Sequence, residues 1–261
     1  MVTPAVAKVR AMSGSAGLGL AVQLYTLRRR LDQDLEATLS ALADAGVREV
    51  ELAGLYGRSG AAMRAALDAA GLTACSAHVP LERFEREPGL VAEEASALGA
   101  ATLVLPSVPP PSSGAAADAI VTRIAAAAAV AADAGLGFAY HNHDFEFRAL
   151  DDGSDLWRRI TALGIDHEPD VGWLQVAGRD PVAVLGELTG RCPLVHAKDV
   201  RRGADGEWED VVAGDGELDW PAIADAAAAA GARRLVVELD NPSADPVADV
   251  ARSLETLTRA R

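Results

Sequence analysis

The chain has little cysteine and no long apolar run. Cys75 and Cys192 form neither a disulfide framework nor the spacing of a metal site. Cys75 lies in an apolar run, which favours a buried free thiol in a reducing compartment. No apolar stretch approaches the ~20 residues of a membrane helix, and residues 1–17 lack the apolar core of a secretory signal. We therefore expect a cytoplasmic protein without a membrane partner, with residues 1–17 as a flexible leader.

Basic residues are also scarce, because 24 Lys and Arg face 38 Asp and Glu and give a formal charge of −14. A nucleic-acid surface needs clustered Lys and Arg. The acid balance therefore excludes a nucleic-acid partner and disfavours a phosphate-directed barrel endonuclease. It is compatible with a cation site without implying one.

The sequence does contain a regular alternation of short apolar strands and helices, and glycine closes most of the helices. Such alternation predicts a parallel sheet with right-handed crossovers. Eight units in about 240 residues fit one closed (β/α)₈ barrel, which we assign to residues 18–261 as a single domain. The strands are expected at 18–24, 47–52, 72–79, 101–105, 138–140, 165–171, 193–197 and 234–239, and a long polar loop at 201–219.

The alternative architecture is an open doubly wound sheet. That fold usually has a Gly-rich phosphate loop after its first strand. Here the first strand leads into Gln23-Leu-Tyr-Thr-Leu-Arg28, which contains no glycine.

The stretch Gly137–Phe147 changes abruptly from apolar to titratable. If its strand runs to position 143, His141 and His143 share one face, because side chains alternate along a strand. Glu146 follows in a loop that can turn its carboxylate back over the strand end. Imidazole and carboxylate together are ligands for a divalent cation such as Mn²⁺, Zn²⁺ or Co²⁺. The alternative is a polar loop whose histidines only cap the strand.

Other polar residues also fall where predicted strands end, and in a barrel all of these ends open on the face where active sites form. A purely structural role would scatter them over the outer helices. The residues concerned are Gln23, Glu51, His78, His141, His143, Glu146, Asp170, His196, Lys198, Asp199, Glu238 and Asp240. No role is assigned to His167, Glu168 or Pro169.

An ordered set of motifs resembles the sugar phosphate isomerase/epimerase family of xylose-isomerase-like barrels over about residues 18–258. Each motif is weak alone, but the ordered set is specific. The motifs are Val22-Gln-Leu-Tyr25, Ala77-His-Val79, Tyr140-His-Asn-His-Asp-Phe-Glu-Phe147, Asp170-Val-Gly-Trp173, Val195-His-Ala-Lys-Asp199, Gly214-Asp-Gly-Glu-Leu-Asp-Trp220 and Val237-Glu-Leu-Asp240.

The resemblance implies one divalent ion, Mn²⁺ before Zn²⁺, Co²⁺ or Mg²⁺, bound by Glu146, Asp170, His196 and Glu238. The chain departs from the family's ketose epimerases at His141, where those enzymes have a glutamate. The first ligand is therefore Glu146, with His141 as its substitute.

Such a site implies a metal-dependent isomerase or epimerase of carbohydrate metabolism, acting on a keto- or aldo-sugar through a metal-stabilised enediolate. His143 is the candidate base or acid. Glu238 could serve as both ligand and base, and Lys198 could donate to the developing oxyanion or form an ion pair with Asp199 or Asp240. The expected substrate contacts are Gln23, Glu51, His78, His141, Trp173 and Asp240, although Trp173 could equally be a core residue.

Two other functions remain open. If a β-hydroxyl or glycosyl group leaves, the same site is a keto-sugar lyase or dehydratase. A non-catalytic sugar-binding barrel would keep the pocket and lose proton transfer, and the retained carboxylates and His143 argue against it. The sequence names neither the sugar nor the oligomeric state, so a homo-oligomer stays open.

Overall fold

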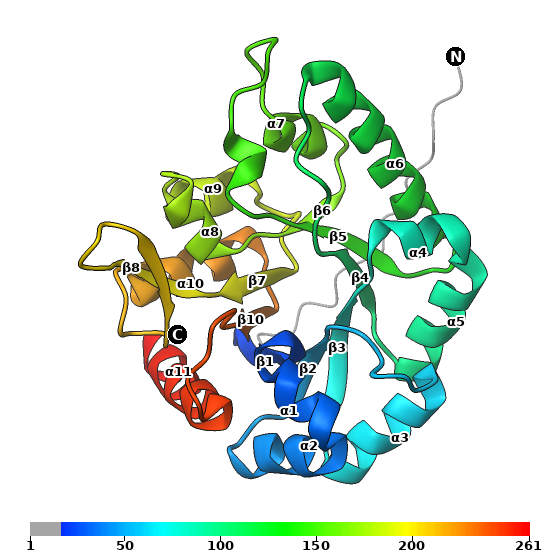
Figure 1. Ribbon diagram of the computed structural model, residues 1–261, viewed down its shortest axis with the longest axis vertical. Helices are drawn as coiled ribbons and strands as arrows, with labels where there is room; N and C mark the ends of the chain where they lie inside the picture. Colours follow the sequence, from blue (N-terminus) through cyan, green and yellow to red (C-terminus); the bar gives the residue numbers. More distant parts are fainter. Residues whose placement is uncertain (1–16) are drawn as a thin grey trace.

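The computed structural model describes residues 17–261, so the leader predicted for residues 1–17 lies almost wholly outside the described residues. All eight predicted strands are present and form one parallel sheet ringed by helices (Figure 1). Their order around the sheet is β6-β5-β4-β3-β2-β1-β10-β7. The strands are β1 (Gly19–Gln23), β2 (Glu49–Leu52), β3 (Thr73–His78), β4 (Thr102–Leu105), β5 (Gly137–His141), β6 (Asp166–Glu168), β7 (Leu194–Ala197) and β10 (Arg234–Val237).

The barrel closes between β6 and β7. There the backbone of Asp170 forms a parallel bridge with His196, and the His196 N–H donates to the Pro169 carbonyl at 2.9 Å. The predicted (β/α)₈ barrel is therefore confirmed. Closure brings all the strand ends that carry polar residues to one face.

The helices begin and end as the capping residues require. Asp or Ser side chains accept from backbone N–H groups at most starts, for example Asp34, Ser59 and Ser113. Glycine ends α3, α5 and α10 with positive φ. The helices are η1 (Leu24–Leu27), α1 (Arg28–Gln33), α2 (Leu35–Asp44), α3 (Gly60–Ala70), α4 (Leu81–Arg86), α5 (Pro88–Leu98), α6 (Gly114–Asp133), η2 (Phe145–Phe147), α7 (Leu156–Thr161), α8 (Val171–Val176), α9 (Pro181–Glu187), α10 (Trp220–Ala230) and α11 (Pro246–Ala260).

Helix α6 is the one described helix with the length and apolar composition to cross a membrane. The sequence expectation that no segment approaches this length therefore needs correction. In the structure α6 packs on β5 and lies against α4 and α7, and Arg123 forms an ion pair with Glu85 at 2.6 Å. A single such helix is weak evidence for a membrane span, since helices of soluble proteins meet the same test of length and composition.

The interior of the barrel has two layers. A lower layer of apolar side chains forms its own buried cluster: Ala21, Val104, Ala139, Leu194 and Val236. Towards the carboxyl ends of the strands lies an upper layer of buried or nearly buried polar side chains: Gln23, Glu51, His78, His141, Glu168, His196 and Glu238. The polar layer is therefore walled in from below.

One local expectation was wrong, and one condition of the sequence argument was not met. The polar loop expected at 201–219 contains an antiparallel hairpin, β8 (Asp199–Arg202) with β9 (Trp208–Val211). Strand β5 ends at His141, not at position 143, because η2 turns the chain directly afterwards. The alternation argument for His141 and His143 therefore does not apply, although their rings still lie 5.2 Å apart between centroids.

Candidate metal centre

A cavity of about 300 Å³ opens at the carboxyl ends of the strands. The predicted residues His78, His141, His143, Glu238 and Asp240 line it together. Its remaining walls are Tyr25, Ala53, Pro80, Pro106 and Ser107.

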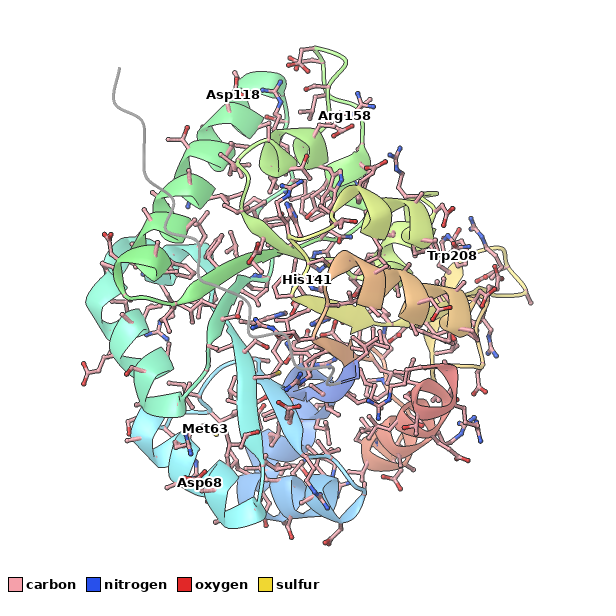
Figure 2. The ribbon with its side chains drawn as sticks, turned by 180° about the vertical axis from the view of Figure 1, so that it is seen from behind. Met63, Asp68, Asp118, His141, Arg158 and Trp208 are labelled. Atoms are coloured by element: carbon pink, nitrogen blue, oxygen red, sulfur yellow. The ribbon has the colours of Figure 1, made fainter. Side chains whose placement is uncertain are left out.

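Two overlapping groups of buried donors could each hold a metal ion in the described part of the chain. Both contain His141 and His196, and His141 lies at the centre of the barrel in Figure 2. The groups are His78, His141, Glu168 and His196, and His141, Asp170, His196 and Glu238.

The two nitrogens of His196 face opposite sets of carboxylates. Nε2 lies 2.7 Å from Glu51 Oε1 and 3.1 Å from Glu168 Oε2. Nδ1 lies 3.1 Å from Glu238 Oε2 and 4.0 Å from Asp170 Oδ2. Nε2 can therefore be held by a hydrogen bond to a carboxylate while Nδ1 remains available to bind a metal ion.

His141 repeats this arrangement. Its Nδ1 lies 3.4 Å from Glu168 Oε2, and its Nε2 lies 3.9 Å from Asp170 Oδ2. Metal-binding histidines usually donate their second ring N–H to a carboxylate or carbonyl. Glu51 is hydrogen-bonded to His196 Nε2 in this way. Glu168 lies beside both rings, although His141 Nδ1 has no hydrogen bond among the described residues. This arrangement leaves the side of Asp170 and Glu238 for an ion.

Asp170 fits a ligand on its own geometry. Its Oδ1 accepts from the Trp173 N–H at 2.9 Å and caps α8. Its Oδ2 is buried and has no hydrogen-bond partner among the described residues. Burial raises the pKa of Asp170 to about 7, against the opposing charge of Lys198. The Lys198 ammonium lies 3.5 Å from Oδ2, but it is shared with Glu238 and Asp240. A buried carboxylate oxygen without a hydrogen bond is costly unless a cation takes it, so the donor set fits a divalent ion.

Lys198 lies beside this group and is almost wholly buried. Its Nζ is hydrogen-bonded to Asp240 and lies 3.2 Å from Glu238 Oε2. Burial alone would lower the pKa of Lys198, but Glu238, Asp170 and Asp240 outweigh burial and raise it. Of the two predicted ion-pair partners, the structure therefore provides Asp240.

Gly172 explains why the motif Asp170-Val-Gly-Trp173 needs a glycine. A Cβ there would lie 2.8 Å from both Cγ and the carbonyl oxygen of Lys198. Helix α8 can approach the ammonium stem only without a side chain at this position.

His143 forms a side wall of the cavity. Its ring lies 5.3 Å from that of Trp173, and Trp173 in turn lies 5.1 Å from the Lys198 ammonium. Burial, with the Lys198 charge, lowers the pKa of His143 to about 4. The imidazole is therefore neutral at pH 7, as a proton acceptor must be.

Glu146 is not among the donors that come together, which alters the predicted ligand set. The Tyr140 hydroxyl donates to its Oε1 at 2.8 Å, and the His143 N–H donates to its Oε2 at 2.9 Å. The turn η2 thus directs this carboxylate back to its own strand. The predicted substitute, His141, takes its place in the group.

The remaining predicted residues lie either beneath the cavity or around it. Gln23 and Glu51 are fully buried and bonded to each other at 2.8 Å, so they lie beneath the cavity lining. His78 lines the cavity and lies 3.0 Å from both Glu51 Oε1 and Glu168 Oε2. Asp199 points away into the following loop, where it accepts from the Gly214 N–H at 2.7 Å and from the Trp220 indole at 2.9 Å.

Glu168 belongs to the site although its residue type and position did not predict it. Its carboxylate is fully buried within 3.4 Å of three imidazoles, those of His78, His141 and His196. The available signal was its spacing, since Glu168 precedes Asp170 by two residues and a strand side chain at that spacing shares a face.

Comparisons with known proteins identify the family and the fold. Residues 39–260 match the family model of the xylose isomerase-like TIM barrel. The rhizopine catabolism protein MocC of Rhizobium meliloti is 28% identical over 87% of this chain and 82% of its own length.

Solved structures show the same fold. A sugar phosphate isomerase/epimerase from Parabacteroides distasonis superposes with a TM-score of 0.80 at 22% identity, covering 99% of both chains. The IOLI protein, whose structure contains a bound zinc atom, superposes with a TM-score of 0.72 at 14% identity over 93% of this chain and 98% of its own. At these identities the likeness establishes the fold alone.

Proposed function

Because the chain belongs to the xylose isomerase-like TIM barrel family, we propose that it is a divalent-metal-dependent isomerase or epimerase of a small carbohydrate. The observation that carries the proposal is the grouping of His141, Asp170, His196 and Glu238, with His143 and Lys198 beside it. Four buried donors beside two groups able to move or stabilise a proton or charge are more than a sugar-binding pocket requires.

The proposed ligands are His141, Asp170, His196 and Glu238, with Mn²⁺ as the first candidate and Zn²⁺, Co²⁺ or Mg²⁺ as alternatives. When bound, the ion would polarise the carbonyl of a hydroxy-carbonyl sugar as a Lewis acid. Glu168 and Glu51 would accept from the remaining ring N–H groups of His141 and His196, so that both imidazoles keep one orientation.

The side chains of this chain would then move the proton. His143, neutral at pH 7 and placed on the cavity wall, would take the proton from the carbon next to the carbonyl. Lys198 would donate to the oxygen on which negative charge develops. Return of the proton from His143 to the former carbonyl carbon, with loss of the proton of the neighbouring hydroxyl, gives isomerisation. Delivery of a proton to the opposite face of the same carbon by a second acid, for which Glu238 is the candidate, gives epimerisation.

We also place the protein in a reducing cytoplasm. Cys75 and Cys192 are free thiols, and burial raises the pKa of Cys75 to about 12. Thiols of this kind are stable without pairing where the surroundings are reducing.

The test is proton exchange. The protein is incubated with Mn²⁺ and a panel of keto-sugars in deuterated water, and NMR detects deuterium at the carbon next to the carbonyl. We expect metal-dependent exchange with at least one sugar, and its loss in Asp170→Asn. No exchange with any sugar, in protein shown to hold metal, would refute the proposal. A product that has lost a hydroxyl or glycosyl group would reassign the protein as a lyase.

A further inference from the structure

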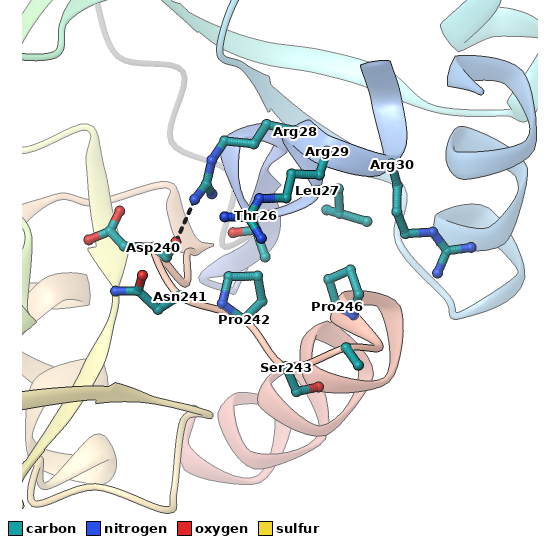
Figure 3. Close-up of a pocket in the computed structure, with 11 residues that line it drawn as sticks. Thr26, Leu27, Arg28, Arg29, Arg30, Asp240, Asn241, Pro242, Ser243 and Pro246 are labelled. Carbon is teal, nitrogen blue, oxygen red and sulfur yellow. Dashed lines mark hydrogen bonds between the residues drawn. The ribbon is translucent and has the colours of Figure 1, made fainter. Parts of the chain in front are cut away.

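A second cavity, of about 260 Å³, lies on the same face between η1–α1 and the loop after β10. Figure 3 shows Arg28, Arg29 and Arg30 along one side of it, opposite Asn241 and Ser243. Three adjacent arginines in one cavity require explanation in a chain whose formal charge is −14.

The described partners of these arginines neither neutralise their positive charge nor occupy all of their N–H donors. Arg28 donates to two carbonyls, those of Tyr25 at 2.9 Å and Asp240 at 2.8 Å, which leaves three of its five N–H groups. Arg30 lies 3.5 Å from Asp245. Within residues 17–261, no carboxylate lies within ion-pair distance of Arg29, which is exposed. The cavity therefore carries net positive charge.

This cavity adjoins the metal centre. Asp240 lines both cavities, and its carboxylate is bound by Lys198, which offsets its charge. Tyr25 lines the cavity of the metal centre and Arg28 lines the arginine cavity. The Arg28 guanidinium lies 4.0 Å above the Tyr25 ring, so the two cavities meet at this pair. Neither cavity exceeds the lower end of the ~300–1,000 Å³ of typical ligand sites. Because they share Asp240, one ligand can extend from one cavity into the other.

We propose that the arginine cavity binds an anionic group of the substrate, a phosphate ester or a carboxylate, while the sugar carbonyl lies at the metal centre. Guanidinium groups form paired, charge-assisted hydrogen bonds with both kinds of oxyanion. Arg29 is the main ligand, because its donors are uncommitted, and Arg28 and Asn241 complete the wall. This inference rests on the proposed function for the identity of the reacting sugar, but not for the binding of the anion.

Binding is measured first, without turnover. Calorimetry with metal-free protein compares glucitol 6-phosphate, gluconate and uncharged glucitol. We expect at least one acid to bind roughly 10-fold or more tightly than glucitol, and the stronger of the two identifies the group. Arg29→Gln should weaken the affinity for that acid by roughly 10- to 100-fold, the range for the loss of a hydrogen bond to a charged group. Arg259→Gln makes the same charge change at the opposite end of the barrel, where Arg259 lines a separate cavity, and should bind as the wild type does.

Equal binding of acid and polyol by the wild type, or an Arg29→Gln variant that binds like the wild type, would overturn the inference. In the exchange assay, Arg29→Gln should lower the ratio of kcat/KM for an acidic ketose to that for its neutral counterpart by a similar factor. If no sugar exchanges protons while acid binding still depends on Arg29, the proposed function fails and the anion site stands.

Discussion

The lower and upper layers of the barrel interior are made by the same strands, two residues apart. Ala21 is followed by Gln23, Ala139 by His141, Leu194 by His196, and Val236 by Glu238. Each pair faces inward because side chains on a strand alternate with a period of two. A step of two residues, about 7 Å along a strand, therefore takes the interior from packed hydrocarbon to a group of ionisable side chains.

The difference shows how the molecule separates stability from function. The lower layer has no polar atoms to satisfy and fills the barrel by packing. The upper layer retains unpartnered buried atoms on His141, Glu168 and Asp170, which is a cost in the absence of a ligand. Substitutions in the lower layer should therefore lower stability, whereas substitutions in the upper layer should lower metal binding and turnover.

The largest effect is expected from the ligands themselves. Asp170→Asn and Glu238→Gln should lose metal by more than the ~10–100-fold that a change outside the ligand shell costs, and proton exchange should be lost with it. Elemental analysis after dialysis measures occupancy. Glu146→Gln is the matched control, because its carboxylate is buried but bonded to Tyr140 and the His143 backbone. If Glu146→Gln lost the metal and Asp170→Asn kept it, our ligand set would be wrong.

A substitution of His143 should affect proton transfer without affecting metal binding. His143→Asn should retain the fold and most of the metal but lower the rate of proton exchange by roughly 10²–10⁴-fold, the usual contribution of a general base. The exchange rate in deuterated water is compared at equal metal occupancy. A variant that exchanges at the wild-type rate would leave His143 as a wall residue, and loss of metal together with activity would make it a ligand.

The lower layer should respond in stability alone. Leu194→Ala removes a buried side chain from the apolar cluster and should cost about 2–5 kcal/mol of unfolding free energy. Its metal affinity should match the wild type. Urea denaturation measures the loss, and Leu90→Ala, at a half-exposed position on α5, is the control. A metal affinity that fell with stability would show that the layers are coupled.

The barrel and most of its polar face could be predicted from sequence because both depend on local patterns. Glycine stops, apolar strands and polar strand ends are visible in the chain, and so His141, Asp170, His196, Lys198 and Glu238 were all among the candidates. Position along a strand does not reveal where a loop turns. The 3₁₀ turn η2 therefore placed Glu146 on its own strand, against expectation.

Glu168 was missed for a related reason. The sequence His167-Glu-Pro-Asp170 looks irregular, because proline interrupts the strand pattern. Sheet pairing places Glu168 opposite His141, and closure of the barrel, through the bridge between Asp170 and His196, brings it to the His196 imidazole as well. Contacts across a closure are tertiary, and a single sequence carries little information about them.

Glu168 also provides the smallest and most discriminating test of the two-layer comparison. Burial, with the nearby Glu51 charge, raises its pKa, so its ionised form costs the metal-free protein free energy. Glu168→Gln removes that charge and keeps an oxygen that can accept from a ring N–H. If Glu168 orients His141 and His196, metal affinity should fall roughly 10–100-fold, while the metal-free protein becomes no less stable. Competition with a chelator measures affinity, and thermal denaturation without metal measures stability. Glu49→Gln, whose carboxylate pairs with Arg234 at the opposite end of β2, should leave affinity unchanged. A Glu168→Gln variant that is less stable without metal but binds metal normally would contradict this role. Glu168 would then stabilise the fold, as the side chains of the lower layer do.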